Sequence, residues 1–421
     1  MTVGPVPRYL LPDSASIDDG DLSIGGVVVR DLAARLGTPL FIYDEQHIVD
    51  RCLEAVSAFP DGVAYATKAF LCKAMARLAH DAGMDLDVAT GGELFVAIEA
   101  GVPASRLVMH GNNKSADEIA MAIEAGIGRL VVDSFDELDR IESLNAGGRP
   151  VRILVRLNPG IEAYTHEYLA TGVVDSKFGF PMAAGHALAA VDRVKRSSVM
   201  DFAGVHAHIG SQVFDTASFS HAVGVLAPFV QEVEADEMSI GGGLGVPYVT
   251  GEPSTSIREW GAIVTATALE AGIAARVTAE PGRAIVAGAA VTAYSVGTIK
   301  DVPDARTYVA VDGGMSDNPR PVLYGSGYEA FLARATDADR PRSVRIVGKH
   351  CESGDFIVKD AHLPSDVVVG DIVCTPVTGA YGHSMGSNYN KVLRPPVVFA
   401  KDGSERLVVE RERYSDLIVR D

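Results

Sequence analysis

Lys68 is the first residue whose type and setting suggest chemistry. It ends the short run Tyr65-Ala-Thr-Lys68, in which small and apolar residues flank its amine. Partial desolvation would lower the pKa of that amine and make it a better nucleophile toward an aldehyde. A lysine just beyond a strand is also an ordinary surface residue, so Lys68 by itself does not establish a site.

Two histidines lie two residues apart on one predicted strand, so the side chains of His206 and His208 point to the same face. They could bind a metal ion, or present an aromatic platform with a hydrogen-bonding edge. The alternative is one core histidine and one histidine at the strand end. A metal-dependent hydrolase is the weaker interpretation, because no further ligand follows at a spacing typical of zinc. Ser211 follows in a turn that could hold an anion.

Glycines and a carboxylate follow the last two strands of the same series. Gly242 and Gly243 belong to a glycine run whose amides could crowd a phosphate, although a tight loop is the usual meaning of such a run. Glu280, in Glu-Pro-Gly282-Arg283, could pair with a protonated ring nitrogen of an electron-accepting cofactor. Arg283 could meet a phosphate or a substrate carboxylate, and a structural ion pair is the alternative.

The C-terminal third adds a second group of polar residues. Arg320 offers a planar fork for a carboxylate and is followed by Tyr324. Cys351 and Glu352 place a potential proton donor beside a carboxylate, although most free cysteines are small buried hydrophobes. Tyr381 lies in a glycine-rich loop, where tyrosines are common in any protein.

The candidate residues between Lys68 and Arg283 fall at the ends of β-rich runs. These runs alternate with segments whose apolar residues recur with the period of a helix. Such alternation predicts a parallel sheet, and eight units over this length favour a (β/α)8 barrel over an open doubly wound sheet. Active sites of barrels lie at the carboxyl ends of the strands, where these residues fall. The expected strands are Val63–Lys68, Asp85–Thr90, Leu107–Gly111, Arg129–Asp133, Val151–Asn158, Phe202–His208, Glu237–Gly241 and Arg276–Glu280.

After about residue 285 the sequence pattern changes to valine- and threonine-rich runs separated by turns. This pattern predicts an antiparallel β domain. The segment Asp21–Arg30 also has strand character and could join that domain. We therefore expect N-terminal strands in 1–35, a barrel in 36–285 and a β domain in 286–421. The capping-box pattern Ser115-Ala-Asp-Glu118 predicts one helix start inside the barrel.

The overall composition limits the kinds of binding partner and the cellular compartment that are expected for this chain. The chain of 421 residues carries a net charge of −18, which disfavours nucleic acid and anionic membranes because both are polyanions. Its four cysteines form no CxxC pair, as expected in a reducing compartment. Neither a signal peptide nor a transmembrane run is evident in the sequence. A cytoplasmic location and a small-molecule substrate are therefore expected.

Ten motifs in order resemble the diaminopimelate decarboxylase family, whose fold combines a barrel with a β domain. The resemblance covers nearly the whole chain, and although each motif is weak or moderate, their order on one barrel plan is specific. The motifs begin at residues 37 (GTPL), 65 (YATKA), 111 (GNNKS), 176 (SKFG), 208 (HIGS), 241 (GGGLG), 280 (EPGR), 320 (RPVLY), 351 (CESGD) and 379 (GAY).

This resemblance implies the cofactor pyridoxal 5′-phosphate, bound as a Schiff base to Lys68, and a role for each residue of the two groups. His208 would stack on the ring and Glu280 would face its nitrogen. The phosphate would be cradled by Ser211, Gly242, Gly243, the 280–283 backbone including Gly282 and Arg283, and Tyr381. The substrate carboxylates would be held by Arg283, Arg320 and Tyr324, with Tyr381 also in the substrate pocket. Cys351 would protonate the carbanion left by carbon dioxide, Glu352 would bind the distal ammonium group, and both would come from the second subunit of a homodimer.

Two departures from the family pattern leave room for an altered pocket. Phe70 follows Lys68-Ala where asparagine is usual, and His383 stands where an aromatic residue is more usual. The alternative function is decarboxylation of ornithine, lysine or a carrier-bound amino acid on the same scaffold. A non-catalytic regulatory homologue is disfavoured, because such a protein would be expected to lose Lys68 or Cys351.

Overall fold

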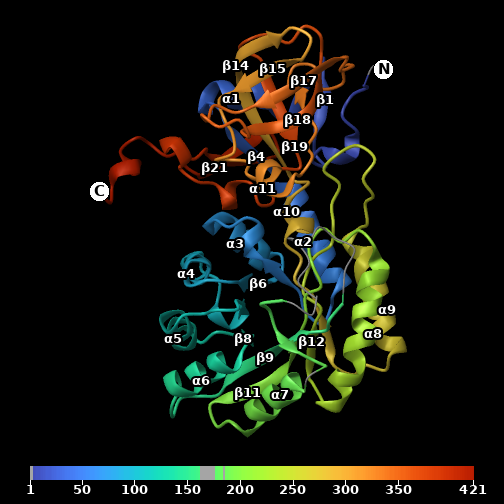
Figure 1. Cartoon of the computed structure of the whole chain (residues 1–421), viewed down its shortest axis with the longest axis vertical. Coiled ribbons are helices and arrows are strands. Elements are labelled where there is room, and N and C mark those ends of the chain that lie inside the picture. The colour runs from blue at the N-terminus through green and yellow to red at the C-terminus, as the bar shows by residue number, and fades with distance from the viewer. Residues whose placement is uncertain (1–2, 162–175, 184) are drawn as a thin grey trace. The chain divides into compact units, whose positions relative to one another are not determined.

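The computed structural model describes residues 3–161, 176–183 and 185–421, and these form two compact units (Figure 1). One unit, called the barrel unit here, comprises residues 51–245 and 254–284. The other, the β unit, comprises residues 1–50, 246–253 and 285–421. Within the described residues, no helix combines the length and the apolar character that crossing a bilayer requires.

Eight parallel strands build the barrel unit, and all eight expected strands are present. Their order is sequential, and an isolated parallel bridge between Val63 and Ala279 joins the last strand to the first. The amide of Ala64 donates to the carbonyl of Ala279 at 2.9 Å, which closes the barrel and excludes the open sheet. The strands are β5 (Ala64–Ala66), β6 (Asp85–Val88), β7 (Leu107–Met109), β8 (Arg129–Val132), β9 (Val151–Asn158), β11 (Met200–His206), β12 (Glu237–Ser239) and β13 (Arg276–Thr278), and a short β10 (Phe180–Pro181) pairs with β9.

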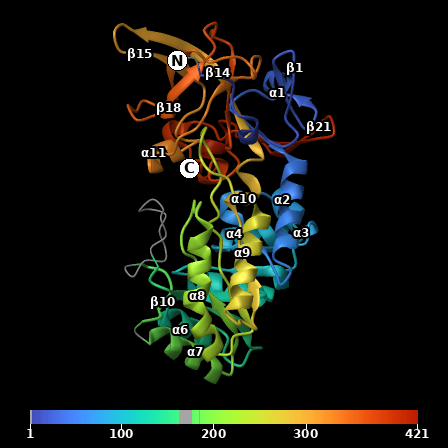
Figure 2. The same cartoon turned by 90° about the vertical axis from the view of Figure 1, so that its right-hand side faces the viewer.

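Helices cover the outer face of this barrel, as Figure 1 shows for α3 to α7, and α8 and α9 lie side by side in Figure 2. The expected capping box is present at α5, where Ser115 accepts from the amide of Glu118 and Glu118 accepts from the amide of Ser115. Gly126 ends that helix in a left-handed conformation. The helices are α3 (Lys73–Asp81), α4 (Gly91–Glu99), α5 (Ala116–Ala125), α6 (Phe135–Leu144), α7 (His186–Arg196), α8 (Thr216–Glu232) and α9 (Ile257–Glu270), with α2 (Glu45–Ala58) and α10 (Arg283–Val286) at the two ends of the unit.

A tightly packed interior holds the barrel together. One apolar cluster draws a buried side chain from each of five strands, namely Ala64, Val108, Val131, Leu154 and Ala203. Small and branched residues of this kind fill a barrel interior without leaving a pore. The strand ends therefore project polar side chains from a rigid base.

The β unit contains a mixed sheet rather than the purely antiparallel one expected. Most neighbouring strands are antiparallel, but β4 pairs with β20 and β15 pairs with β17 in parallel. Long connections between these strands permit parallel pairing, and strand composition alone does not reveal it. The strands are β4 (Leu40–Asp44), β14 (Ala290–Val302), β15 (Arg306–Val311), β16 (Phe331–Leu332), β17 (Arg342–Val347), β18 (Phe356–Leu363), β19 (Ile372–Pro376), β20 (Val397–Lys401) and β21 (Ser404–Val409).

The N-terminal segment differs from expectation in two ways. Strands β1 (Ser16–Asp18), β2 (Asp21–Ile24) and β3 (Val27–Val28) form a separate three-stranded sheet, and α1 (Val29–Leu36) follows at once. The N-terminal contribution to the β unit also extends to residue 50, beyond the boundary expected at 35. The reason is β4, which pairs with both β14 and β20 of the mixed sheet.

Candidate active site

Lys68 lies on a short 3-10 turn, η2 (Thr67–Ala69), directly after β5. Lys68 is exposed, whereas its neighbours Thr67 and Ala69 are buried, and the partial desolvation of its amine stays a prediction. The turn packs against the segment that follows β13. The amide of Ala66 donates to the carbonyl of Pro281 at 3.1 Å, and a Cβ added to Gly282 would lie 3.0 Å from the carbonyl oxygen of Ala66. Glycine at 282 therefore lets the two strand ends meet.

The glycine turn after β12 is wedged between two other strand ends. A Cβ on Gly242 would lie 2.3 Å from the carbonyl oxygen of Glu280, and one on Gly243 would lie 2.2 Å from that of Gly210. Such distances leave no room for a side chain at either position. Backbone amides are therefore the groups that this turn can offer to an anion.

His208 follows β11 and lies against the same turn, where its Nδ1 accepts a hydrogen bond from the amide of Gly242 at 3.2 Å. Burial, followed by the charges of Lys68 and Arg156, lowers the pKa of His208 well below its usual range. The ring is therefore neutral at physiological pH. A neutral, half-buried imidazole is suited to pack flat against another ring.

Two of the expected anion-binding residues are in direct contact. The guanidinium of Arg283 is buried and donates from its Nη2 to the hydroxyl of Ser211 at 3.0 Å. Ser211 follows β11 and Arg283 begins α10, so the bond joins the ends of two strands that are not adjacent in the barrel. This pair and the glycine turn have the donors that a phosphate group needs.

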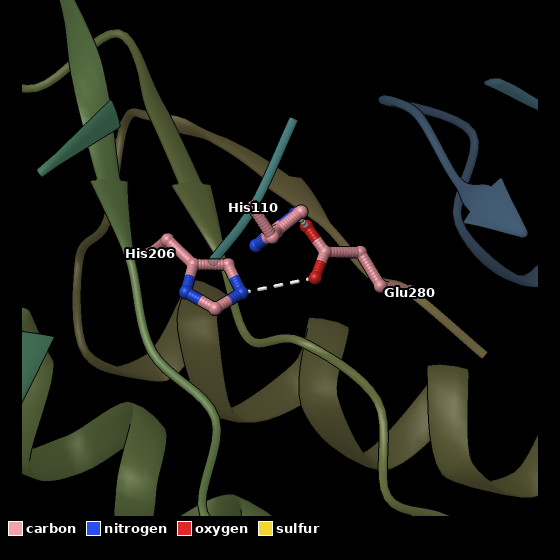
Figure 3. A group of neighbouring side chains, drawn as sticks. All are labelled: His110, His206 and Glu280. Atoms are coloured by element: carbon pink, nitrogen blue, oxygen red, sulfur yellow. Dashed lines mark hydrogen bonds and ion pairs between the residues drawn. The ribbon is translucent and has the colours of Figure 1, made fainter. Parts of the chain in front are cut away.

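Glu280 lies at the centre of a buried polar group that comes from three other strands (Figure 3). Its Oε2 is 2.9 Å from Nε2 of His206, and its Oε1 accepts from the hydroxyl of Ser239 at 3.0 Å. Nε2 of His110 lies 3.3 Å from Oε1, and the rings of His110 and His206 meet edge to face with centroids 4.8 Å apart. His206 therefore turns toward Glu280 and does not form a pair with His208.

These contacts determine the charge of the carboxylate. Burial raises the pKa of Glu280, but His110 and His206 outweigh burial and hold that pKa well below its usual range. Burial lowers the pKa of His206, and Glu280 only partly compensates. For His110 burial also lowers the pKa, yet Asp87 and Glu280 together raise it above the usual value. Glu280 is consequently an anion and His206 is neutral near neutral pH, while the two neighbouring carboxylates favour the protonated form of His110.

His110, Asp87 and Ser239 are site residues that sequence reasoning missed. Asp87 lies on β6, His110 directly follows β7, and Ser239 ends β12. Each was within an expected strand segment, and His110 directly precedes the motif at residue 111. The rule that polar residues at strand ends face the site could have found them.

The remaining expected residues lie in the β unit, and the one most firmly held is Arg320 at the start of α11 (Arg320–Tyr324). Its guanidinium carbon lies 3.9 Å from the ring centre of Tyr248, and its Nη1 donates to the hydroxyl of Tyr328 at 2.6 Å. Tyr324 ends the helix and is half-buried. Tyr381 has a left-handed backbone, with φ of 58°, which is strained for a residue other than glycine.

Cys351 and Glu352 are exposed at the tip of a loop, and Glu352 accepts a hydrogen bond from the hydroxyl of Tyr389. The buried carboxylate of Asp355 fastens this loop to the segment that precedes Arg320. Its Oδ1 accepts from the amide of Met315 at 2.7 Å and its Oδ2 from the amide of His350 at 2.8 Å. The structure thus gathers Lys68, His208, Ser211, Gly242, Gly243, Glu280, Gly282 and Arg283 in the barrel unit, and Arg320, Tyr324, Cys351, Glu352 and Tyr381 in the β unit.

Comparisons with known proteins find similar proteins over nearly the whole chain. The model of the family "Pyridoxal-dependent decarboxylase, pyridoxal binding domain" matches residues 45–287. The diaminopimelate decarboxylase of Bacillus subtilis is 43% identical, with 97% of each chain covered, and that of Mycobacterium tuberculosis is 44% identical, with 95% of this chain and 94% of the relative covered. A crystal structure of diaminopimelate decarboxylase from M. jannaschii in co-complex with L-lysine has a TM-score of 0.90 at 33% identity, covering 97% of this chain and 98% of that one.

Proposed function

The chain belongs to the diaminopimelate decarboxylase family of pyridoxal-dependent decarboxylases, and we propose from this premise that it converts meso-2,6-diaminopimelate into L-lysine and carbon dioxide. The reaction would be the last step of lysine biosynthesis. The cofactor is pyridoxal 5′-phosphate. The observation that carries the proposal is the meeting of four strand ends in one barrel, at Lys68, Ser211, the glycine turn and Glu280.

The barrel residues fit the cofactor on chemical grounds. Lys68 is an exposed primary amine and would hold the aldehyde covalently. Ser211, Arg283 and the amides of Gly242 and Gly243 would bind the phosphate, with Gly282 allowing close approach and Tyr381 adding a hydrogen bond. His208, a neutral ring, would stack on the pyridine, and the anionic Glu280 would accept from its protonated nitrogen.

The residues of the β unit, with Arg283, would select the substrate. Diaminopimelate has an amino acid at each end, so its distal end needs both an anionic and a cationic partner. Arg283, Arg320, Tyr324 and Tyr381 would hold carboxylate groups, and Glu352 would bind the distal ammonium group. A decarboxylase of ornithine, lysine or a carrier-bound amino acid would not need this set, because those substrates lack the second free carboxylate.

The chemistry divides between cofactor and chain. When bound, the cofactor would supply an electron sink for the pair that remains on Cα after loss of the carboxylate. Arg283 and Arg320 orient the carboxylates, and Glu280 keeps the proton on the ring nitrogen. The thiol of Cys351 then donates a proton to Cα, which completes the amino-acid product.

The proposal includes a homodimer in which Cys351 and Glu352 act in the site of the other subunit. Their exposure supports it, because a proton donor at a loop tip is available to a second chain. We also propose a cytoplasmic location, which is supported by four cysteines that are all free.

The direct test is release of carbon dioxide from meso-diaminopimelate by the wild type, Lys68→Ala and Cys351→Ala. We expect no turnover with Lys68→Ala, and turnover about a hundredfold slower with Cys351→Ala, because a general acid commonly contributes that much. Borohydride reduction should fix the cofactor to the peptide that contains Lys68. His186→Asn, at an exposed position on α7, serves as the control and should retain wild-type activity.

Two results would refute the proposal. Absence of a reducible cofactor linkage in the wild type would exclude the pyridoxal chemistry at Lys68. Faster release of carbon dioxide from ornithine or lysine than from diaminopimelate would instead assign the chain to the alternative decarboxylases.

A further inference from the structure

We propose that His110, supported by His206, is a positioning residue that keeps Glu280 free of a proton, so that the proton shared between Glu280 and the cofactor stays on the ring nitrogen. This inference rests on the proposed role of Glu280 toward that nitrogen. It assigns a function to a histidine that has no expected contact with the substrate.

The hydrogen bonds that Glu280 accepts from Ser239 and His206 leave acceptor positions for a further donor. A carboxylate has about four acceptor positions on its two oxygens. Ser239 and His110 approach Oε1 at 3.0 and 3.3 Å, and His206 approaches Oε2 at 2.9 Å. Nε2 of His110 makes no hydrogen bond in the described structure, so both oxygens keep an acceptor position, and the one on Oε2 could receive a single protonated ring nitrogen.

The charges of the group leave one negative charge to be balanced. Nε2 of His110 lies between two buried carboxylates, 3.3 Å from Glu280 and 3.7 Å from Asp87. Glu280 is an anion, because His110 and His206 hold its pKa well below the usual range, so a buried negative charge faces the proposed position of the ring nitrogen. Unbalanced buried charge is costly, so a protonated ring nitrogen would be the natural counterion.

Other charged groups face these histidines and oppose the cation at His110. Arg156 lowers the pKa values of His110 and His206, and it lies 3.8 Å from its own partner, Asp133. The charge of Lys68 helps burial to lower the pKa of His208, so that histidine is neutral. The pKa of His110 remains raised in spite of Arg156, because two carboxylates act on it against one guanidinium.

Distance decides where the shared proton resides. His110 and His206 contact the carboxylate of Glu280 directly, whereas they would influence the ring nitrogen only through that carboxylate. A cation disfavours protonation most strongly at the nearest basic group. His110 thus lowers the proton affinity of Glu280 more than that of the ring nitrogen, and the proton moves toward the ring.

The test uses holoenzyme reconstituted with pyridoxal phosphate labelled with 15N in the ring, in the wild type and in His110→Gln. Glutamine keeps a hydrogen-bond donor near the position of Nε2 but lacks the charge. In the wild type the 15N shift should indicate a protonated nitrogen at neutral pH and should titrate together with the His110 imidazole at higher pH. In His110→Gln the shift should move toward that of a neutral pyridine, and this titration should disappear.

Two further measurements separate positioning from mere structural support. His110→Gln should bind pyridoxal phosphate about tenfold more weakly in equilibrium dialysis, a ratio equal to about 1.4 kcal/mol. Its kcat should fall while its KM for diaminopimelate changes little, because the loss concerns the ring and not the substrate contacts. A purely structural role for His110 would lower the melting temperature without moving the 15N shift.

Asp87→Asn provides a second variant in case His110→Gln fails to fold. It removes one of the two carboxylates that stabilise the histidinium, so the 15N titration should move to lower pH. Unchanged 15N titration in a folded His110→Gln or Asp87→Asn would overturn the inference. Failure of the wild type to bind the cofactor at Lys68 would instead refute the proposed function, and the two failures are thereby distinguished.

Discussion

Glu280 and Asp317 are both buried carboxyl groups, yet their pKa values are shifted in opposite directions. At Glu280 two histidines outweigh burial and keep the pKa well below its usual range. Asp317 receives the hydroxyl of Tyr294 at 2.7 Å and the amide of Gly314 at 2.8 Å, and these neutral donors do not compensate for burial. Burial, with the charges of Asp312 and Asp355, raises the pKa of Asp317 to about 7.

This difference predicts how stability depends on pH in the β unit. The folded state binds the proton of Asp317 more tightly than the unfolded chain, so its stabilising contribution is complete below about pH 4 and is lost as pH rises through about 7. Each pH unit in that window should cost up to about 1.4 kcal/mol. Asp317→Asn, whose amide can donate to the Tyr294 oxygen, should reduce the fall in melting temperature between pH 5 and pH 8. An equal fall in both proteins would contradict the prediction.

At the scale of single residues, sequence reasoning identified the residues that change type abruptly at a strand end. Lys68, Ser211 and Glu280 stand out because a charged or hydroxyl group follows a run of apolar or small residues. His110 also follows an apolar run, Leu107–Met109, and the same rule could have found it, but its contact with Glu280, 170 positions further along the chain, cannot be read from the sequence.

At the scale of elements, the segment 246–253 has a particular role. It continues the chain directly from the glycine turn of the barrel unit but packs within the β unit. Thr250 anchors it there, with its amide and hydroxyl donating to Glu329 at 3.1 and 2.7 Å. The segment thereby places the ring of Tyr248 over Arg320, while Tyr328 fixes one end of the same guanidinium.

We expect Tyr248→Leu to weaken substrate binding, because a desolvated cation–π contact contributes about 2 kcal/mol, or roughly a thirtyfold change in KM. Tyr248→Phe keeps the ring and should stay within about twofold of the wild type. Steady-state kinetics with diaminopimelate, alongside melting temperatures, would measure both. Similar KM values in the two variants would show that the ring does not orient Arg320.

The elements most easily predicted were those whose apolar residues follow a regular pattern along the sequence. All eight barrel strands were expected from β-rich runs that alternate with helical ones, and β9 has the expected bounds Val151–Asn158. Strand β4 was not among the expected strands, since its place is determined by pairing with β14 and β20, which lie roughly 250 and 350 residues away in sequence. The parallel pairs of the mixed sheet escaped prediction for the same reason.

At the scale of the whole molecule, the proposed exchange of Cys351 between subunits can be tested with hybrid dimers. Co-expressed Lys68→Ala and Cys351→Ala chains should regain about one quarter of wild-type activity, because half of randomly assembled dimers are hybrids and each contains one intact site. Each variant alone should remain deficient, and separately purified variants that are mixed without subunit exchange serve as the control. If the co-expressed chains show no gain, Cys351 acts within its own subunit.

The division of the chain into a barrel unit and a β unit limits how the two units can be recombined in evolution. The chain passes between the barrel unit and the β unit four times, after residues 50, 245, 253 and 284. No single truncation or recombination breakpoint therefore separates one unit from the other, although domains that are contiguous in sequence are easily exchanged. The glycine turn and the tyrosine over Arg320 lie on one uninterrupted stretch of gene. Any exchange of that stretch would carry the anchor for the cofactor phosphate and the support of the substrate arginine together, so the two are expected to evolve as a linked pair.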